Sequence, residues 1–124
     1  MRPERDRLSD MLSAIRAIEN DVVGMDETSF LATFGVDSRF ADAICFRLIV
    51  IGEAVAALRE AARRDPAAAQ IIATHPEIDW RGYVGMRNIV AHRYFRRDPA
   101  PIWLAIRDEL PALRSVVEEA LSRP

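Results

Sequence analysis

A run of apolar residues that keeps helical spacing for about six turns constrains this chain more than any other feature. Its members are Phe40, Ile44, Leu48, Ile51, Val55, Leu58 and Ala62. The pattern predicts one long helix over residues 39–64. Further apolar residues lie off this stripe, so we expect the helix to be either central in a bundle or covered by a second copy of the chain.

Gly52 lies inside this predicted helix. A glycine at an interior helical position costs about 1 kcal/mol relative to alanine. That penalty is easier to understand if another backbone approaches closely at Gly52. Together with the apolar circumference of the helix, the glycine favours a dimer.

Two shorter elements precede the long helix. Apolar residues between positions 8 and 22 recur at three- and four-residue intervals, and Gly24 can end the helix that they predict. Residues 28–34 permit a short apolar helical turn, which we expect Gly35 to break.

Start and stop signals divide the rest of the chain into helices. The alanine-rich stretch after Pro66 permits a short helical piece, and Asp79 is a good N-cap for a helix from Trp80 towards Tyr94. A last helix over residues 98–121 should be kinked or divided by Pro111. The predicted fold class is therefore all-α: a bundle of four to five main helices around one long central helix, in a single domain over residues 1–124.

Composition narrows the class of protein. Half of the 124 residues are hydrophobic, and 17 basic residues nearly balance 19 acidic ones, which excludes a disordered chain. The single cysteine, Cys45, can form no internal disulfide and is expected to be a small buried side chain. The start of the sequence lacks the apolar run of a signal peptide, and the run from Leu48 to Ile51 is too short to cross a bilayer. We therefore expect a cytoplasmic protein with no membrane partner.

The charge is unevenly distributed. Between Trp80 and Arg97 there are five arginines and no carboxylate, which leaves 12 basic and 19 acidic residues in the rest of the chain. A cationic face on an acidic protein would attract a phosphodiester. A chance run of arginines on a solvated helix face explains the charge equally well.

Helical geometry gathers four polar residues of this segment on one face. At about 100° per residue, Arg87, Asn88, His92 and Tyr94 fall together, while apolar side chains such as Val90 point the opposite way. Asn88 and His92 are four residues apart, a spacing at which side chains touch.

These residue types suit one reaction, the cutting of RNA without metal or cofactor. The 2′-hydroxyl loses a proton, attacks the adjacent phosphorus and expels the 5′-oxygen. His92 can act as base or acid near neutral pH, and Arg87 can stabilise charge on the phosphoryl oxygens. One chain supplies a single such histidine, so a full acid and base pair requires two copies. A lone histidine on a helix is nevertheless more often structural or solvated than catalytic.

The same residues carry a family resemblance. Arg87-Asn88, then His92, Arg93 and Tyr94 resemble the Arg, four to six residues, His, any residue, Tyr motif of HEPN domains, in the form typical of HepT-like toxins. Three other stretches are similar to that family. They are Ile51-Gly52-Glu53-Ala54, then His75-Pro76-Glu77-Ile78 with Trp80, Gly85 and Met86, and finally Tyr94-Phe95, Asp98 and Ile102-Trp103.

The resemblance implies a HEPN-type helical bundle with a definite activity. HepT-like toxins are metal-independent RNases that act as homodimers with two facing motifs. By resemblance Arg87 and His92 are catalytic and Asn88 supports them. The family's partner is a small nucleotidyltransferase antitoxin of the MntA type, which adds AMP to the motif tyrosine, here Tyr94. Phosphates beside Arg87 and His92 would block the anion site. In the same segment, the arginines expected to bind RNA are Arg93, Arg96 and Arg97.

The sequence departs from the family at one place that matters. Members often carry an acidic residue and an Arg-Asn pair where this chain has Phe46-Arg47-Leu48-Ile49, which leaves Glu53 as the carboxylate to support Arg87. A support role for Glu53 and a plain salt bridge across the bundle are equally good interpretations. The stretch from Arg63 to Thr74 is longer than usual, and His75 beside its proline is expected to be solvated.

Two other interpretations of the whole chain stay open. One is a non-catalytic HEPN module that binds a nucleotide or a partner nucleotidyltransferase without cutting RNA. The other is a purely structural helical dimer. Loss of RNA cleavage on replacement of His92 would favour the RNase over both.

Overall fold

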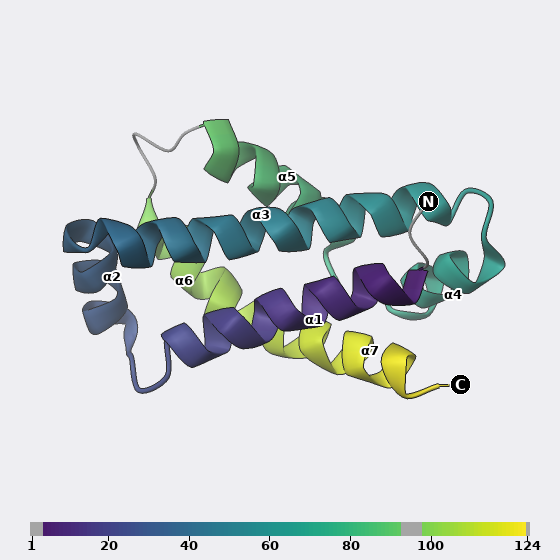
Figure 1. Cartoon of the computed structure of the whole chain (residues 1–124), viewed down its shortest axis with the longest axis horizontal. Coiled ribbons are helices and arrows are strands. Elements are labelled where there is room, and N and C mark those ends of the chain that lie inside the picture. The colour runs from purple at the N-terminus through teal and green to yellow at the C-terminus, as the bar shows by residue number, and fades with distance from the viewer. Residues whose placement is uncertain (1–3, 93–97, 124) are drawn as a thin grey trace.

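The computed structural model describes residues 4–92 and 98–123, and over these residues it is built of helices without a strand (Figure 1). The all-α expectation is confirmed. The helices are α1 Glu4–Asp21, α2 Glu27–Val36, α3 Ser38–Ala61, α4 Pro66–Thr74, α5 Trp80–His92, α6 Pro99–Leu104 and α7 Leu110–Ser122, with a π-helical turn over Ala105–Glu109 between the last two.

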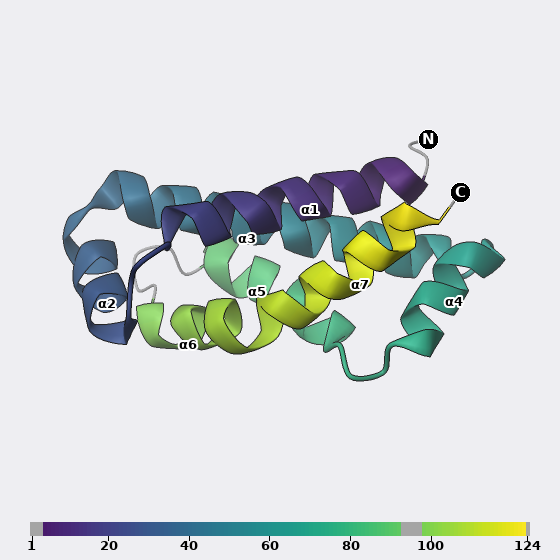
Figure 2. The same ribbon diagram turned by 90° about the horizontal axis from the view of Figure 1, so that it is seen from below.

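The long helix predicted from the apolar stripe is α3, and it spans the length of the molecule (Figure 1). Helices α1 and α5 pack along α3 on different sides. Seen from below, α7 lies beside α1, and α6 lies beside α2 (Figure 2). The stripe members Ile44, Ile51, Val55 and Leu58 are fully buried. Helix α3 is therefore the centre of the core, as its pattern predicts.

Short polar side chains set the helix boundaries. Asp26 accepts a hydrogen bond from the Ser29 backbone N–H at 2.8 Å and starts α2 with a capping box. Asp79 accepts from the Gly82 N–H at 3.0 Å, as expected for the N-cap of α5. Gly24, whose φ is +78°, adopts the left-handed conformation that lets the chain turn after α1.

The expectation that Gly35 breaks its helix is wrong. Helix α2 continues through Gly35 to Val36. Glycine weakens a helix by about 1 kcal/mol, and the capping box with packing in the core outweighs that cost here. The break comes instead at Asp37, whose carboxylate accepts from the N–H groups of Arg39 and Phe40 and so starts α3.

Pro111 divides the last helix, as predicted. It lies in the first turn of α7, directly after the π-helical turn. Proline removes one backbone donor and its ring crowds the carbonyl four residues earlier, and a wider π turn accommodates both effects.

An aromatic contact joins α2 to α6, two helices that are far apart in the sequence. Phe30 of α2 stacks against Trp103 of α6 with ring centroids 5.0 Å apart. Trp80 and Trp103 are both buried, so each belongs to the core of the chain. Cys45 is buried as expected.

None of the helices within the described part of the chain has the length and apolar character needed to cross a membrane.

Candidate active site on helices α3 and α5

Gly52 of α3 lies at a close contact with α5. A Cβ atom on this glycine would lie 2.5 Å from the Arg87 Cβ and 2.8 Å from the Tyr83 carbonyl oxygen. A close approach of another backbone was expected at Gly52, but the approaching helix belongs to the same chain. The glycine therefore explains how α5 packs and no longer supports a dimer.

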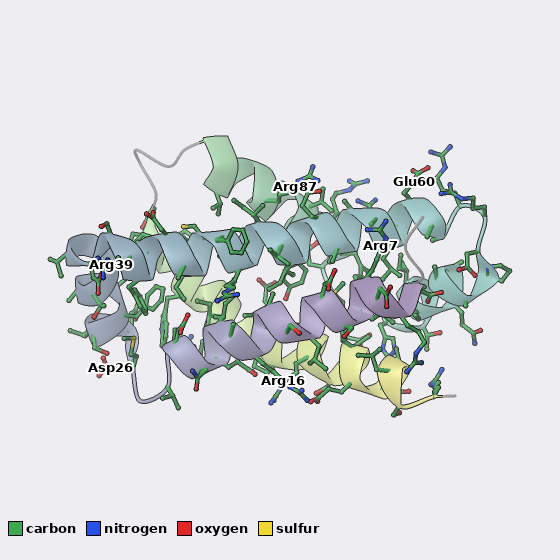
Figure 3. The ribbon with its side chains drawn as sticks, in the orientation of Figure 1. Arg7, Arg16, Asp26, Arg39, Glu60 and Arg87 are labelled. Atoms are coloured by element: carbon green, nitrogen blue, oxygen red, sulfur yellow. The ribbon has the colours of Figure 1, made fainter. Side chains whose placement is uncertain are left out.

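Glu53, the next residue, meets Arg87 across this contact. The Arg87 Nη1 atom lies 3.3 Å from the Glu53 Oε1 atom. The arginine side chain is 24% exposed and the glutamate side chain 63% exposed. Because the carboxylate is largely solvated, the ion pair contributes at most about 1 kcal/mol to stability. The labelled, partly buried Arg87 side chain lies where α5 rests on α3 (Figure 3).

Helix α5 also carries two other residues singled out from the sequence. Asn88 follows Arg87, and His92 is the last residue of the helix. Their backbone positions are one helical turn apart, as the predicted face requires. The side chains of Asn88 and His92 lie outside what the structure describes, and so do Arg93, Tyr94, Arg96 and Arg97 altogether.

Tyr83 holds α5 from the core side. Its side chain is buried, and its hydroxyl has no hydrogen-bond partner among the described atoms. Burial raises the pKa of the Tyr83 hydroxyl, and the carboxylates of Glu109 and Asp79 add to the effect. The phenol therefore stays protonated at neutral pH and is unsuited to exchanging protons with a substrate.

Sequence reasoning missed the part that His75 plays at the start of α5. The side chain is only 19% exposed, and its Nδ1 atom lies 3.1 Å from the Glu77 Oε2 atom. The His75 carbonyl accepts a hydrogen bond from the Trp80 indole at 3.1 Å. The expectation of a solvated His75 is therefore wrong, because this residue ties the approach segment to the first residue of α5.

An apolar groove flanks the Glu53–Arg87 pair on the α1 side of α3. Phe46 is 59% exposed there although it is a large aromatic side chain. The groove is lined by Arg7, Asp10, Phe46, Ile49, Val50, Glu53, Ala54, Ala56 and Ala57. Since Glu53 belongs both to the groove and to the ion pair, the apolar surface is continuous with the candidate site.

Arg47 belongs to the stretch Phe46-Arg47-Leu48-Ile49, where the sequence departs from the family pattern. Arg47 is half-buried, and its Nε atom has no hydrogen-bond partner among the described atoms. Its guanidinium carbon lies 5.9 Å from the centre of the Phe46 ring, within the range of a cation–π contact. Arg47 therefore faces Phe46, and the carboxylate paired with Arg87 is that of Glu53.

The sequence of the chain is similar to those of proteins named as ribonucleases. A protein of Thermococcus cleftensis named "Probable ribonuclease HepT" is 29% identical over 118 residues, which cover 95% of this chain and 96% of that protein. A protein of Caldanaerobacter subterraneus subsp. tengcongensis, provisionally named as an RNase, is 33% identical over 76 residues, or 61% of this chain and 60% of that protein. No solved structure matches significantly.

A family model settles the assignment. The model described as "Ribonuclease HepT-like" matches residues 11–120, a span that contains α3, α5 and the Glu53–Arg87 pair. The resemblance found in the sequence is confirmed, and the chain belongs to the HepT-like ribonuclease family.

Proposed function

We propose that this protein is a metal-independent endoribonuclease toxin that cuts RNA with Arg87 and His92. The observation that carries the proposal is the Glu53–Arg87 pair, because it holds a partly buried guanidinium on the helix that also bears Asn88 and His92. The relatives named as ribonucleases support the same activity.

The chemistry follows from the residue types. His92 takes the proton from a ribose 2′-hydroxyl, whose oxygen then attacks the adjacent phosphorus. The bond to the 5′-oxygen breaks, and that oxygen takes up a proton, which leaves a 2′,3′-cyclic phosphate and a 5′-hydroxyl. Arg87 stabilises the charge on the phosphoryl oxygens, with its direction fixed by Glu53. Asn88 orients His92 or holds the phosphate.

The site is complete only in a homodimer. One motif supplies a single histidine, whereas the reaction needs one group to remove a proton and another to give one back. The apolar groove beside Glu53 is the surface that a second copy would cover, with the exposed Phe46 ring as its anchor. Two motifs facing each other there would supply both proton carriers.

We further propose that an MntA-type nucleotidyltransferase regulates the toxin by adding AMP to Tyr94. Tyr94 is two residues beyond His92, so the added phosphate would lie beside the residues that bind the RNA phosphate. Negative charge at that place excludes substrate by repulsion and by filling the anion site. The arginines expected to bind RNA, Arg93, Arg96 and Arg97, belong to the same segment.

The test compares two RNA oligonucleotides in the presence of EDTA. One is unmodified, and the other carries a 2′-deoxynucleotide at the position that is cut. The proposal predicts cleavage of the first only, with products that end in a 2′,3′-cyclic phosphate and a 5′-hydroxyl. A requirement for a divalent cation, or a 5′-phosphate on the product, would overturn the mechanism. A wild-type protein that binds nucleotide and cuts neither RNA would be a non-catalytic module.

A further inference from the structure

A second groove, between α3 and α5, carries charge that the motif does not account for. It is lined by Ala56, Arg59, Glu60, Arg63 and Val84. Gly52 faces Arg87 and Tyr83 while Ala56 and Glu60 share a groove with Val84, so the two helices run antiparallel. The groove therefore leads away from the Glu53–Arg87 pair towards the end of α3 and the start of α5.

The groove and the ion pair share one face of α3. Glu53, Ala56 and Glu60 follow one another at intervals of three and four residues, the spacing of side chains on a single helix face, and Arg63 lies in the turn directly after α3. From Glu53 to Glu60 this face extends about 10 Å at a rise of about 1.5 Å per residue. Glu60 and Arg87, both labelled, lie along the same edge of the molecule (Figure 3).

Arginine dominates the rim of this groove. Arg59 and Arg63 line the groove and are exposed, and Arg81, which is also exposed, lies outside the lining and precedes the groove residue Val84 by one turn of α5. The acidic residue in the groove, Glu60, pairs with Arg63 at 3.5 Å and with Arg64 at 3.4 Å. Such long, exposed pairs are weak and open readily to a competing anion.

We propose that this groove binds the phosphate backbone of the RNA substrate beyond the cut position, with Arg59, Arg63 and Arg81 as the contacting residues. The inference rests on the proposed ribonuclease function and adds to it the surface along which the RNA strand would lie. Arg87 stands at one end of the path, the rim arginines continue its positive charge, and small apolar side chains on the floor leave room for a ribose or base. Along this path the arginines outnumber the two carboxylates, Glu53 and Glu60, and the excess of positive charge favours a polyanion.

The test uses the double variant Arg59→Gln with Arg63→Gln, and the single variant Arg81→Gln. Cleavage of an RNA of some 20 nucleotides is compared with cleavage of a dinucleotide, which reaches only the motif. The variants should raise the KM for the long RNA, leave its kcat unchanged, and cut the dinucleotide like the parent. The slope of log KM against log salt should fall by about 1.4 in the double variant, because each phosphate of a single strand that an arginine neutralises contributes about 0.7 to it.

Two controls sharpen the result. Arg16→Gln removes an exposed arginine of α1 that lies on the opposite edge of the molecule and pairs with Glu118, and it should change neither substrate's cleavage (Figure 3). Glu60→Gln removes the negative charge from the groove and should lower the KM for the long RNA, which is the opposite effect.

The outcomes separate the groove from the proposed function. A parent protein that cuts neither RNA contradicts the ribonuclease function itself. A parent that cuts both RNAs, with unchanged KM and salt slope in the arginine variants, overturns the groove alone. If the variants keep their RNA kinetics and instead escape neutralisation by the nucleotidyltransferase, the groove is a protein docking site and the proposal is wrong.

Discussion

Gly52 and Arg87 are in contact where the central helix meets the helix that bears the motif, and a methyl group on Gly52 would come within 2.5 Å of the Arg87 Cβ. Such a contact is closer than real Cβ atoms make. The glycine is therefore what allows α5 to lie near enough for Glu53 to pair with Arg87. The position of the proposed catalytic arginine depends on a residue that has no side chain.

Gly52→Ala should displace α5 and reduce both stability and activity. Overpacking of this kind costs about 1–3 kcal/mol, and the loss would appear as a lower midpoint of urea unfolding. RNA cleavage should fall as well, because Arg87 would be moved. Gly35→Ala is the matched control, since that glycine is also helical and a Cβ atom on it would meet nothing within 4 Å. It should stabilise the protein slightly and leave cleavage unchanged.

Glu53→Gln should separate the function of the ion pair from its stability. The carboxylate is 63% exposed, so the free energy of unfolding should change by less than about 1 kcal/mol. Cleavage should fall clearly, mainly in kcat, because the Arg87 guanidinium loses the charge that fixes its direction. Glu60→Gln, which removes a carboxylate from the same helix, should not lower kcat. An unchanged kcat in Glu53→Gln would make the pair a plain salt bridge.

Phe46→Glu should convert the proposed dimer into monomers. In the proposed dimer the second copy would bury the new carboxylate. The free energy needed to remove that charge from water is more than a dimer of modest size can offset. Sedimentation velocity should show the smaller species, and RNA cleavage should be lost with it. Val36→Glu is the control, because Val36 is 88% exposed at the far end of α2. A dimer that survives Phe46→Glu would place the interface elsewhere.

Incubation with the nucleotidyltransferase and ATP should add about 329 Da, or a multiple, to a peptide that contains Tyr94, the mass of one AMP residue. The modified protein should no longer cut RNA, because the added phosphate fills the anion site. Tyr94→Phe should remain unmodified, while Tyr83→Phe should still be modified, since Tyr83 is buried in the core. Mapping of the AMP to another residue would contradict this regulation.

Much of the fold could be predicted from the sequence because it rests on local patterns. The apolar stripe identifies α3, Asp79 starts α5, and Pro111 divides the last helix. Gly35 failed as a predicted break because core packing and a capping box outweigh a weak local preference. Local rules cannot weigh such tertiary contributions.

The site could be predicted only in part, for a similar reason. The motif residues on α5 are neighbours in the sequence, so helical geometry places them on one face. Glu53 is far from Arg87 in the sequence, so local patterns could not show that the fold brings the two side chains to 3.3 Å. Arg59 and Arg63 were not predicted to bind RNA, because nearby acidic residues balance their charge in the sequence, although both line the groove between α3 and α5.

Cleavage of RNA in EDTA by the wild-type protein and by His92→Ala, side by side, tests the central claim most directly. Circular dichroism and unfolding of both proteins establish that the variant keeps its fold. The wild type should cut the RNA, and the variant should leave it intact and lose its ability to arrest growth. A folded His92→Ala protein that cuts RNA as fast as the wild type would contradict the proposed active site.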